Sequence, residues 1–110
     1  MADSLFLNEQ ELILQRAVRD FAERELAPRA HELDMIEEFP WENFKGIADL
    51  GLFGLTIDPE YGGTGGGYRE LCVVVEEMAK ACAATSIIYS AHLSLAAQTI
   101  LRLGTEEQKQ

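Results

Sequence analysis

The stretch TSIIYSAHLSLAAQTIL, residues 85–101, decides how this chain folds. It contains no charged residue, no glycine and no proline, so nothing in it interrupts a helix. At helical pitch its apolar residues lie around the whole circumference, which is typical of a buried helix or a membrane span. A span needs about 20 mostly apolar residues and anchoring flanks, and the polar residues here dilute that pattern. We therefore predict a central helix over about residues 84–103, capped by Thr85 or Ser86 and covered by other elements.

The composition indicates one small folded domain. The chain has 110 residues, 47% of them hydrophobic, and a net charge of −10. Such acidity disfavours nucleic acid and anionic membranes as partners, because binding either requires clustered Lys and Arg. The acidic N-terminus resembles neither a signal peptide nor a transit peptide. Cys72 and Cys82 would lie about 15 Å apart on one helix, too far for a disulfide, so we expect reduced thiols in a reducing compartment.

Three further helices are expected around the central one. Asn8 is a good N-cap for a first helix that continues, with a kink, past Pro28. A second helix begins near Pro40 and ends at Gly51, and a third covers residues 68–82. The fold class is therefore all-α, an antiparallel bundle of about four helices with a glycine-rich loop before the third. Thr105 would cap one more helix, which has barely begun where the chain stops, as expected of a truncated chain.

The sequence pattern alone indicates no catalytic, cofactor-binding or metal site. The loop DPEYGGTGGG, residues 58–67, fails the dinucleotide fingerprint because Tyr68 stands where the third glycine is required, and it also fails the P-loop pattern. We interpret it as a sharply turning loop. No catalytic triad and no metal-ligand spacing is present. His92 lies among apolar residues, so a hydrogen-bonded structural role is favoured for it over a catalytic one.

Five segments, taken in order, resemble the acyl-CoA dehydrogenase family. They are R-D-F-A-E-R-E-L-A-P-R-A at 19–30, P-E-Y-G-G-T-G at 59–65, V-E-E-M-A-K-A-C-A-A-T-S at 75–86, S-A-H-L-S-L at 90–95 and G-T-E-E-Q-K-Q at 104–110. The resemblance covers only the N-terminal helical domain of that family. It implies that residues 1–110 are this domain, cut at its C-terminal end, without the middle β-domain and the C-terminal helical domain.

What the resemblance implies is an FAD-dependent α,β-dehydrogenation of acyl-CoA thioesters, with electrons passed to an electron-transferring flavoprotein. The enzyme is expected to be a homo-oligomer in the cytoplasm, or in the mitochondrial matrix if this is a mature eukaryotic chain. The isolated fragment is expected to bind no FAD and to be inactive, because the family's catalytic glutamate and most flavin contacts belong to the missing parts. We therefore assign no catalytic or metal residue, and no flavin contact, within it.

One side of the predicted central helix carries the expected binding residues. In the family, a face of this helix lines the slot for the fatty-acyl tail. Matched along S-A-H-L-S-L and the residues before it, that face corresponds to Ile87, Ile88, Ala91 and Leu95, which also share one side in the helical projection. An alkyl tail gains about 0.8 kcal/mol per buried CH₂ against such a wall. Two alternatives stay open: a stand-alone helical protein-interaction module, and an acyl-binding module without catalysis.

Overall fold

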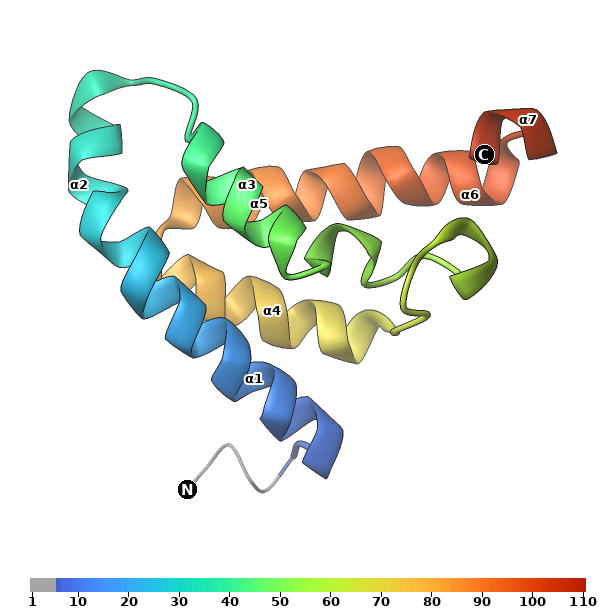
Figure 1. The fold of residues 1–110 in the computed structure, drawn as a ribbon, viewed down its shortest axis with the longest axis horizontal. Helices are drawn as coiled ribbons and strands as arrows, with labels where there is room; N and C mark the ends of the chain where they lie inside the picture. Colours follow the sequence, from blue (N-terminus) through green and yellow to red (C-terminus); the bar gives the residue numbers. More distant parts are fainter. Residues whose placement is uncertain (1–5) are drawn as a thin grey trace.

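The computed structural model describes residues 6–110, and every regular element in that range is helical. The first long helix runs through α1, a π-helical turn and α2, and the last long helix runs through α5, a second π-helical turn and α6 (Figure 1). In chain order the elements are α1 Glu9–Phe21, the turn Ala22–Leu26, α2 Ala27–Ile36, α3 Trp41–Asp49, two short 3₁₀ turns Leu52–Gly54 and Pro59–Tyr61, α4 Tyr68–Ala81, α5 Ala83–Ala91, the turn His92–Ala97, α6 Gln98–Leu103 and α7 Glu106–Lys109. The prediction of an all-α bundle is confirmed.

Local signals set most of the helix ends. The Asn8 side chain accepts a hydrogen bond from the backbone N–H of Glu11, and the Glu11 carboxylate accepts one from the N–H of Asn8, which forms a capping box. Thr105 caps α7 in the same way. Gly51 follows α3 with a left-handed φ of 75°, as predicted. The first long helix continues past Pro28, as predicted. Its axis bends in Figure 1 where the π-helical turn Ala22–Leu26 leads into α2.

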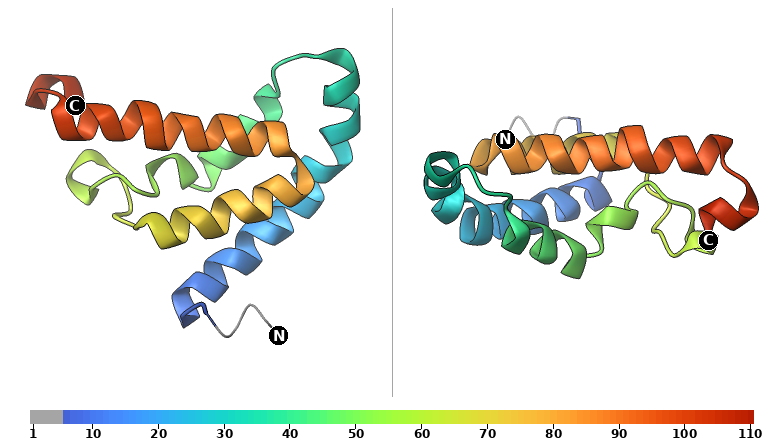
Figure 2. Two further views of the ribbon diagram at one scale, coloured as in Figure 1. Left: turned by 180° about the vertical axis from the view of Figure 1, so that it is seen from behind. Right: turned by 90° about the horizontal axis from the view of Figure 1, so that it is seen from above.

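The cap predicted for the central helix was wrong. This helix begins at Ala83, and Cys82, in an extended conformation, is the only residue between α4 and α5. α4 and α5 therefore fold back on each other as an antiparallel pair (Figure 2). Thr85 and Ser86 are both buried and use their hydroxyls elsewhere: Ser86 donates to the Val75 carbonyl at 2.8 Å.

The core lies around α4, which packs against α1 and α5. Residues of α3 and of the turn after it complete the core. Its largest members are buried aliphatic and aromatic side chains, which gather from every long helix: Val18, Phe21, Leu26, Ile47, Leu52, Leu71, Val74, Met78, Tyr89 and Leu93. The molecule measures 41 × 38 × 19 Å, so it is a slab about two helix diameters thick (Figure 2). In such a slab α4 packs against α1 on one side and α5 on the other, whereas the last long helix leaves one face uncovered.

That geometry leaves the predicted cover of the central helix incomplete. Its buried side carries Thr85, Ser86, Tyr89, Leu93 and Gln98, of which three are polar. Several of its large apolar residues lie outside instead, with Ile87, Leu95, Ile100 and Leu103 between 48% and 83% exposed. An uncharged helix can therefore leave one face exposed. Its buried face can include polar side chains, because these side chains are hydrogen-bonded.

Asn43 joins three helices at one buried point. Its side-chain oxygen accepts two hydrogen bonds from the Arg29 guanidinium of α2, at 2.7 and 3.1 Å. Its amide nitrogen donates to the Thr85 hydroxyl of α5 at 3.0 Å, and this hydroxyl donates to the Cys82 sulfur at 3.2 Å. Asn43 itself is fully buried, so each of these contacts replaces a contact with water.

Candidate functional site

The four residues predicted to contact an acyl tail lie on the helix formed by α5, the π-helical turn and α6. Ile87 and Leu95 are 68% and 69% exposed on its outer side, while Ile88 and Ala91 are half-buried. Ile88 lines a cavity of about 660 Å³ near the start of α5. The four side chains thus form an open apolar strip rather than an enclosed slot. Their role as a tail wall stays a prediction.

The π-helical turn His92–Ala97 falls within this strip. Such a turn has more residues per turn than an α-helix, so residues after it are rotated relative to a uniform helical projection. Leu95 lies in that turn, whereas Ile87, Ile88 and Ala91 precede it in α5. The uniform helical projection of the sequence did not include this turn.

The side of the helix opposite the strip is held by hydrogen bonds to the loop segment after α3. The Tyr89 hydroxyl donates to the Leu52 carbonyl at 2.7 Å, and the Gln98 amide donates to the Thr56 carbonyl at 3.0 Å. Burial raises the pKa of Tyr89, so its hydroxyl stays protonated and keeps donating. These contacts fix the helix in rotation as well as in position. The strip is therefore presented on a rigid support.

Two buried carboxylates were missed by sequence reasoning. Glu77 of α4 has a side chain only 1% exposed, and Arg19 of α1 donates to both of its oxygens at 2.8 and 3.0 Å, with Lys80 adding a contact at 3.0 Å. The Arg19 guanidinium holds the pKa of Glu77 below its ordinary value. The signal was present in the helical pattern: Glu77 stands three and four residues after the buried Val74 and Val73.

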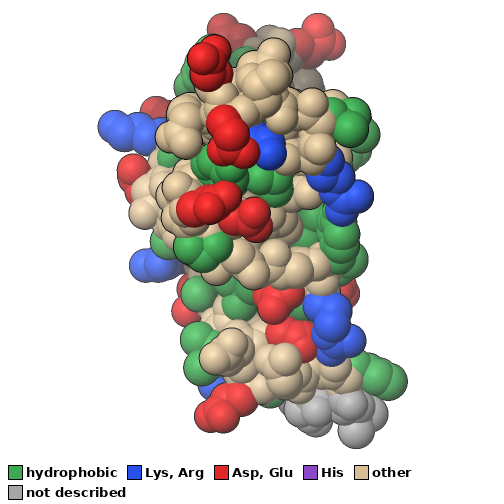
Figure 3. All heavy atoms as spheres, turned by 90° about the vertical axis from the view of Figure 1, so that its right-hand side faces the viewer, with side chains coloured by type: hydrophobic (Ala, Val, Ile, Leu, Met, Phe, Trp, Pro, Cys, Tyr) green, Lys and Arg blue, Asp and Glu red, His purple; other side chains and the backbone are tan. Residues whose placement is uncertain are grey.

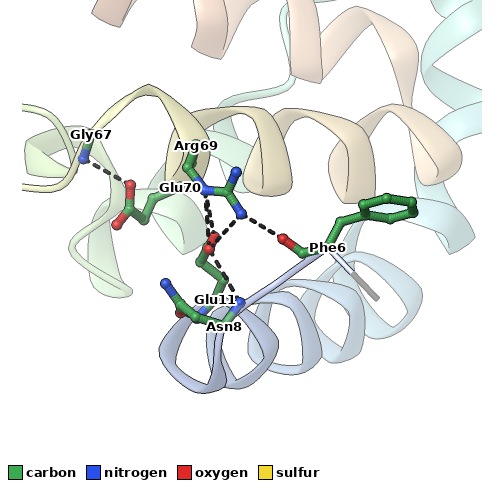
Figure 4. A network of polar contacts seen from close by, with 6 residues as sticks. All are labelled: Phe6, Asn8, Glu11, Gly67, Arg69 and Glu70. Atoms are coloured by element: carbon green, nitrogen blue, oxygen red, sulfur yellow. Dashed lines mark hydrogen bonds and ion pairs between the residues drawn. The ribbon is translucent and has the colours of Figure 1, made fainter. Parts of the chain in front are cut away.

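The second carboxylate, Glu11, pairs with Arg69 between α1 and α4. The guanidinium donates to Glu11 Oε1 and Oε2 at 3.0–3.2 Å and to the Phe6 carbonyl at 2.6 Å, as Figure 4 shows. Hydrogen bonding to Arg69 lowers the pKa of Glu11. Both carboxylates are ionised and already occupied by cations. Neither has the raised pKa that a general base in an apolar pocket would show, so they join α1 to α4 rather than perform catalysis.

The glycine-rich loop does not fit the phosphates of a dinucleotide. Binding them requires free backbone N–H groups, but the N–H groups of residues 62–67 are all used within the chain. For example, Gly63 donates to the Asp58 carbonyl at 3.2 Å and Gly66 to the Leu55 carbonyl at 2.7 Å. Gly67 donates to the Glu70 carboxylate at 2.9 Å. The interpretation as a sharply turning loop agrees with this, and no flavin contact is assigned to it.

The remaining candidates are also placed. His92 is exposed, and its ring meets Phe53 edge-on with centroids 5.1 Å apart, so in the described part of the chain it packs against an aromatic ring instead of making the structural hydrogen bond predicted for it. Both cysteines are free thiols, Cys82 buried and Cys72 exposed. Within residues 6–110 no group of His, Cys, Asp and Glu side chains could hold a metal ion. None of the helices in that range combines the length and hydropathy needed to cross a membrane.

The chain has 19 acidic and 9 basic side chains. On the end face in Figure 3 the acidic side chains run down the middle, and Lys and Arg lie mostly towards its edges. This distribution offers no basic patch for nucleic acid on that face.

Three relatives place these features in a family context. The short-chain specific acyl-CoA dehydrogenase of Clostridium acetobutylicum is 49% identical over 93% of this chain, and the match covers 27% of that protein. Butyryl-CoA dehydrogenase of Megasphaera elsdenii superimposes with a TM-score of 0.86 at 34% identity, over 94% of this chain and 28% of that one. A chain from a structure described as the electron transferring flavoprotein of Acidaminococcus fermentans superimposes with a TM-score of 0.89 at 35% identity, over 94% of this chain and 27% of that one.

This chain therefore spans only about a quarter of the length of these relatives. A family model described as "Acyl-CoA dehydrogenase, N-terminal domain" matches residues 8–110, which is nearly the whole chain and includes every helix described above. The chain belongs to the acyl-CoA dehydrogenase family and corresponds to its N-terminal helical domain.

Proposed function

We propose that this chain is the N-terminal domain of an FAD-dependent acyl-CoA dehydrogenase and supplies one wall of its acyl-tail pocket. The wall is the strip formed by Ile87, Ile88, Ala91 and Leu95. The observation that carries the proposal is the exposure of this apolar strip on a helix whose other side is fixed by buried hydrogen bonds. A rigid apolar surface open on one side is what a pocket wall completed by other segments requires.

The remaining parts of the proposal concern the whole protein. A middle β-domain and a C-terminal helical domain would supply the catalytic base and the flavin site. FAD would accept the electrons and an electron-transferring flavoprotein would receive them, in a homo-oligomeric enzyme. The free thiols fit a reducing compartment, such as the cytoplasm or the mitochondrial matrix. We assign no flavin contact to this chain, so the role proposed for it concerns the acyl tail.

Ala91 offers the sharpest test of the wall. In a chimaera that carries this chain on the remaining domains of butyryl-CoA dehydrogenase from Megasphaera elsdenii, Ala91→Phe should shorten the longest tail that is accepted. Each CH₂ excluded from the wall should weaken kcat/KM by about fourfold, which corresponds to about 0.8 kcal/mol. Ala96→Phe, at an exposed alanine outside the strip, is the matched control.

The two variants separate the possible outcomes. An equal tail-length profile for both would remove Ala91 from the wall.

The isolated 110-residue chain, mixed with FAD and butyryl-CoA, should show no substrate-dependent bleaching of the flavin. Bleaching there would contradict the proposal that other domains supply the base and the flavin site.

A further inference from the structure

A cavity of about 660 Å³ lies where α2 ends and α5 begins. In Figure 1 the connection from α2 to α3 arches away from the body beside the start of α5. Apolar side chains of both parts line the cavity, including Leu33, Phe39, Cys82, Ala84 and Ile88. Its volume lies within the range of roughly 300–1,000 Å³ that is usual for ligand sites.

The rim of this cavity is acidic. Asp34, Glu37 and Glu38 line it, and residues 32–42 contain five carboxylates but no Lys or Arg. Within residues 6–110 these three carboxylates form no ion pair, while Arg29 nearby already contacts Glu42 at 3.4 Å and Asn43 at 2.7 Å. They also stand at the C-terminal end of α2, which is the negative end of the helix dipole and has no basic residue in its last turn. The corner therefore holds uncompensated negative charge.

Large apolar side chains are also exposed at this corner. Met35 and Trp41 are 69% and 75% exposed, and Ile36 and Phe39 about half exposed. Trp41 packs against Phe39 with ring centroids 4.5 Å apart, and Phe39 stacks on Phe44 at 5.1 Å. Exposed clusters of this kind, rich in aromatic side chains, are typical of binding surfaces.

We propose that this corner, defined by Leu33, Asp34, Glu37, Glu38, Phe39 and Trp41, binds a basic amphipathic helix of a partner protein. One apolar side chain of that helix enters the cavity, and its Lys or Arg residues meet the three unpaired carboxylates. Charge complementarity selects this occupant, because anionic lipids and nucleic acids are repelled by the rim. The cavity shares Ile88 with the tail strip, but Ile87 and Leu95, which are exposed on the outer side of the strip, do not line it.

Trp41 is the chain's single tryptophan and stands at the edge of the corner, so its fluorescence reports occupation. The probe is a helical Leu/Lys peptide with amphipathic periodicity, titrated into the 110-residue chain. The emission of Trp41 should shift to shorter wavelength and saturate, and added salt should weaken the affinity. A Leu/Glu peptide of the same pattern should cause no shift.

Matched variants distinguish this site from general attraction to an acidic protein. The triple variant Asp34→Asn, Glu37→Gln, Glu38→Gln should bind the Leu/Lys peptide about tenfold more weakly. The control Glu23→Gln, Asp49→Asn, Glu107→Gln removes the same charge from exposed positions elsewhere and should bind as the natural chain does. Filling the cavity with Ala84→Phe should also weaken binding, whereas Ala96→Phe should not. If Ala84→Phe loses its helical circular dichroism, Ala84→Val replaces it.

Several results would overturn the proposal. These are equal weakening by both charge variants, equal binding of the Leu/Glu peptide, or an unchanged affinity in both Ala84 variants. A Trp41 shift that depends on protein concentration alone would assign the corner to a second copy of the chain. A shift caused by butyryl-CoA would assign the cavity to the acyl ligand.

Discussion

Glu77 shows how much one side chain contributes at the residue scale. It is buried between Arg19 and Lys80, whose own side chains are 37% and 55% exposed and so partly screened by water. We expect Glu77→Ala to lower the free energy of unfolding by about 2 kcal/mol, less than for a fully buried pair because both cations can rehydrate. Urea denaturation measures this. Glu76→Ala, the exposed neighbour on α4, should change it by less than about 0.5 kcal/mol.

The pH dependence of stability follows from the same carboxylates. The pKa values of Glu77 and Glu11 are lowered in the folded chain, so their contribution is complete above the unfolded value of about 4.3 and is lost as the pH falls through the folded values. The urea midpoint should therefore stay constant from about pH 7 to 5 and fall below about pH 4.5. Glu77→Gln should flatten this fall. A midpoint that rises on acidification would contradict the lowered pKa values.

Individual residues were the hardest part to predict. Glu11 is a charged residue in the first turn of α1, yet it is 1% exposed and lies on the buried stripe with Gln15 and Val18. A charged side chain on an apolar stripe is buried only if a cation reaches it from another helix. That cation, Arg69, is 58 positions away in the chain, so periodicity within one helix cannot reveal it.

At the element scale, the glycine-rich loop owes its path to close approaches rather than to flexibility. A Cβ at Gly63 would stand 2.0 Å from the carbonyl oxygen of Ile57, which is backbone and cannot move away. Gly63→Ala should therefore lower the free energy of unfolding by about 3 kcal/mol. Gly62→Ala is the control: a Cβ there meets nothing within 4 Å, and only its φ of 88° is strained, at a cost of about 1 kcal/mol. Equal losses would rule out the close approach as the cause.

Helix ends were predictable wherever a cap acts locally. Asn8, Gly51 and Thr105 set their helix ends through hydrogen bonds or backbone angles that involve only nearby residues. The start of α5 was not predictable in this way. Thr85 looks like a cap, but its hydroxyl is taken by Asn43, which is 42 positions away. A tertiary contact overrode the local preference.

At the scale of the whole molecule, the outer side of the last long helix should make the chain self-associate. Ile87 and Leu95 expose most of their surface, and Leu103 is 83% exposed. Sedimentation at rising concentration should show oligomers, which Ile87→Ser with Leu95→Ser should suppress. Ile13→Ser with Leu50→Ser removes comparable exposed residues from α1 and the end of α3 and should not suppress them. A clean monomer of the natural chain at high concentration would count against this prediction.

The sequence predicted the helices but not their arrangement as a slab. An uncharged segment such as residues 85–101 fits equally well inside a bundle or against one layer of it. Only the packed structure shows that Tyr89 and Leu93 face inward while Ile87 and Leu95 face outward. The residues of the candidate strip were thus predicted from the family resemblance and the helical projection. Only the structure shows that the strip is exposed to solvent.

The buried amide of Asn43 has a consequence for how this chain can change over time. Its oxygen depends on Arg29 and its nitrogen on Thr85, so replacing any one of the three leaves a dehydrated polar atom behind. A tolerated change must therefore replace all three residues together, for instance with apolar residues of matching volume. Positions 29, 43 and 85 are therefore expected to covary across descendants of this sequence, although they are far apart along it.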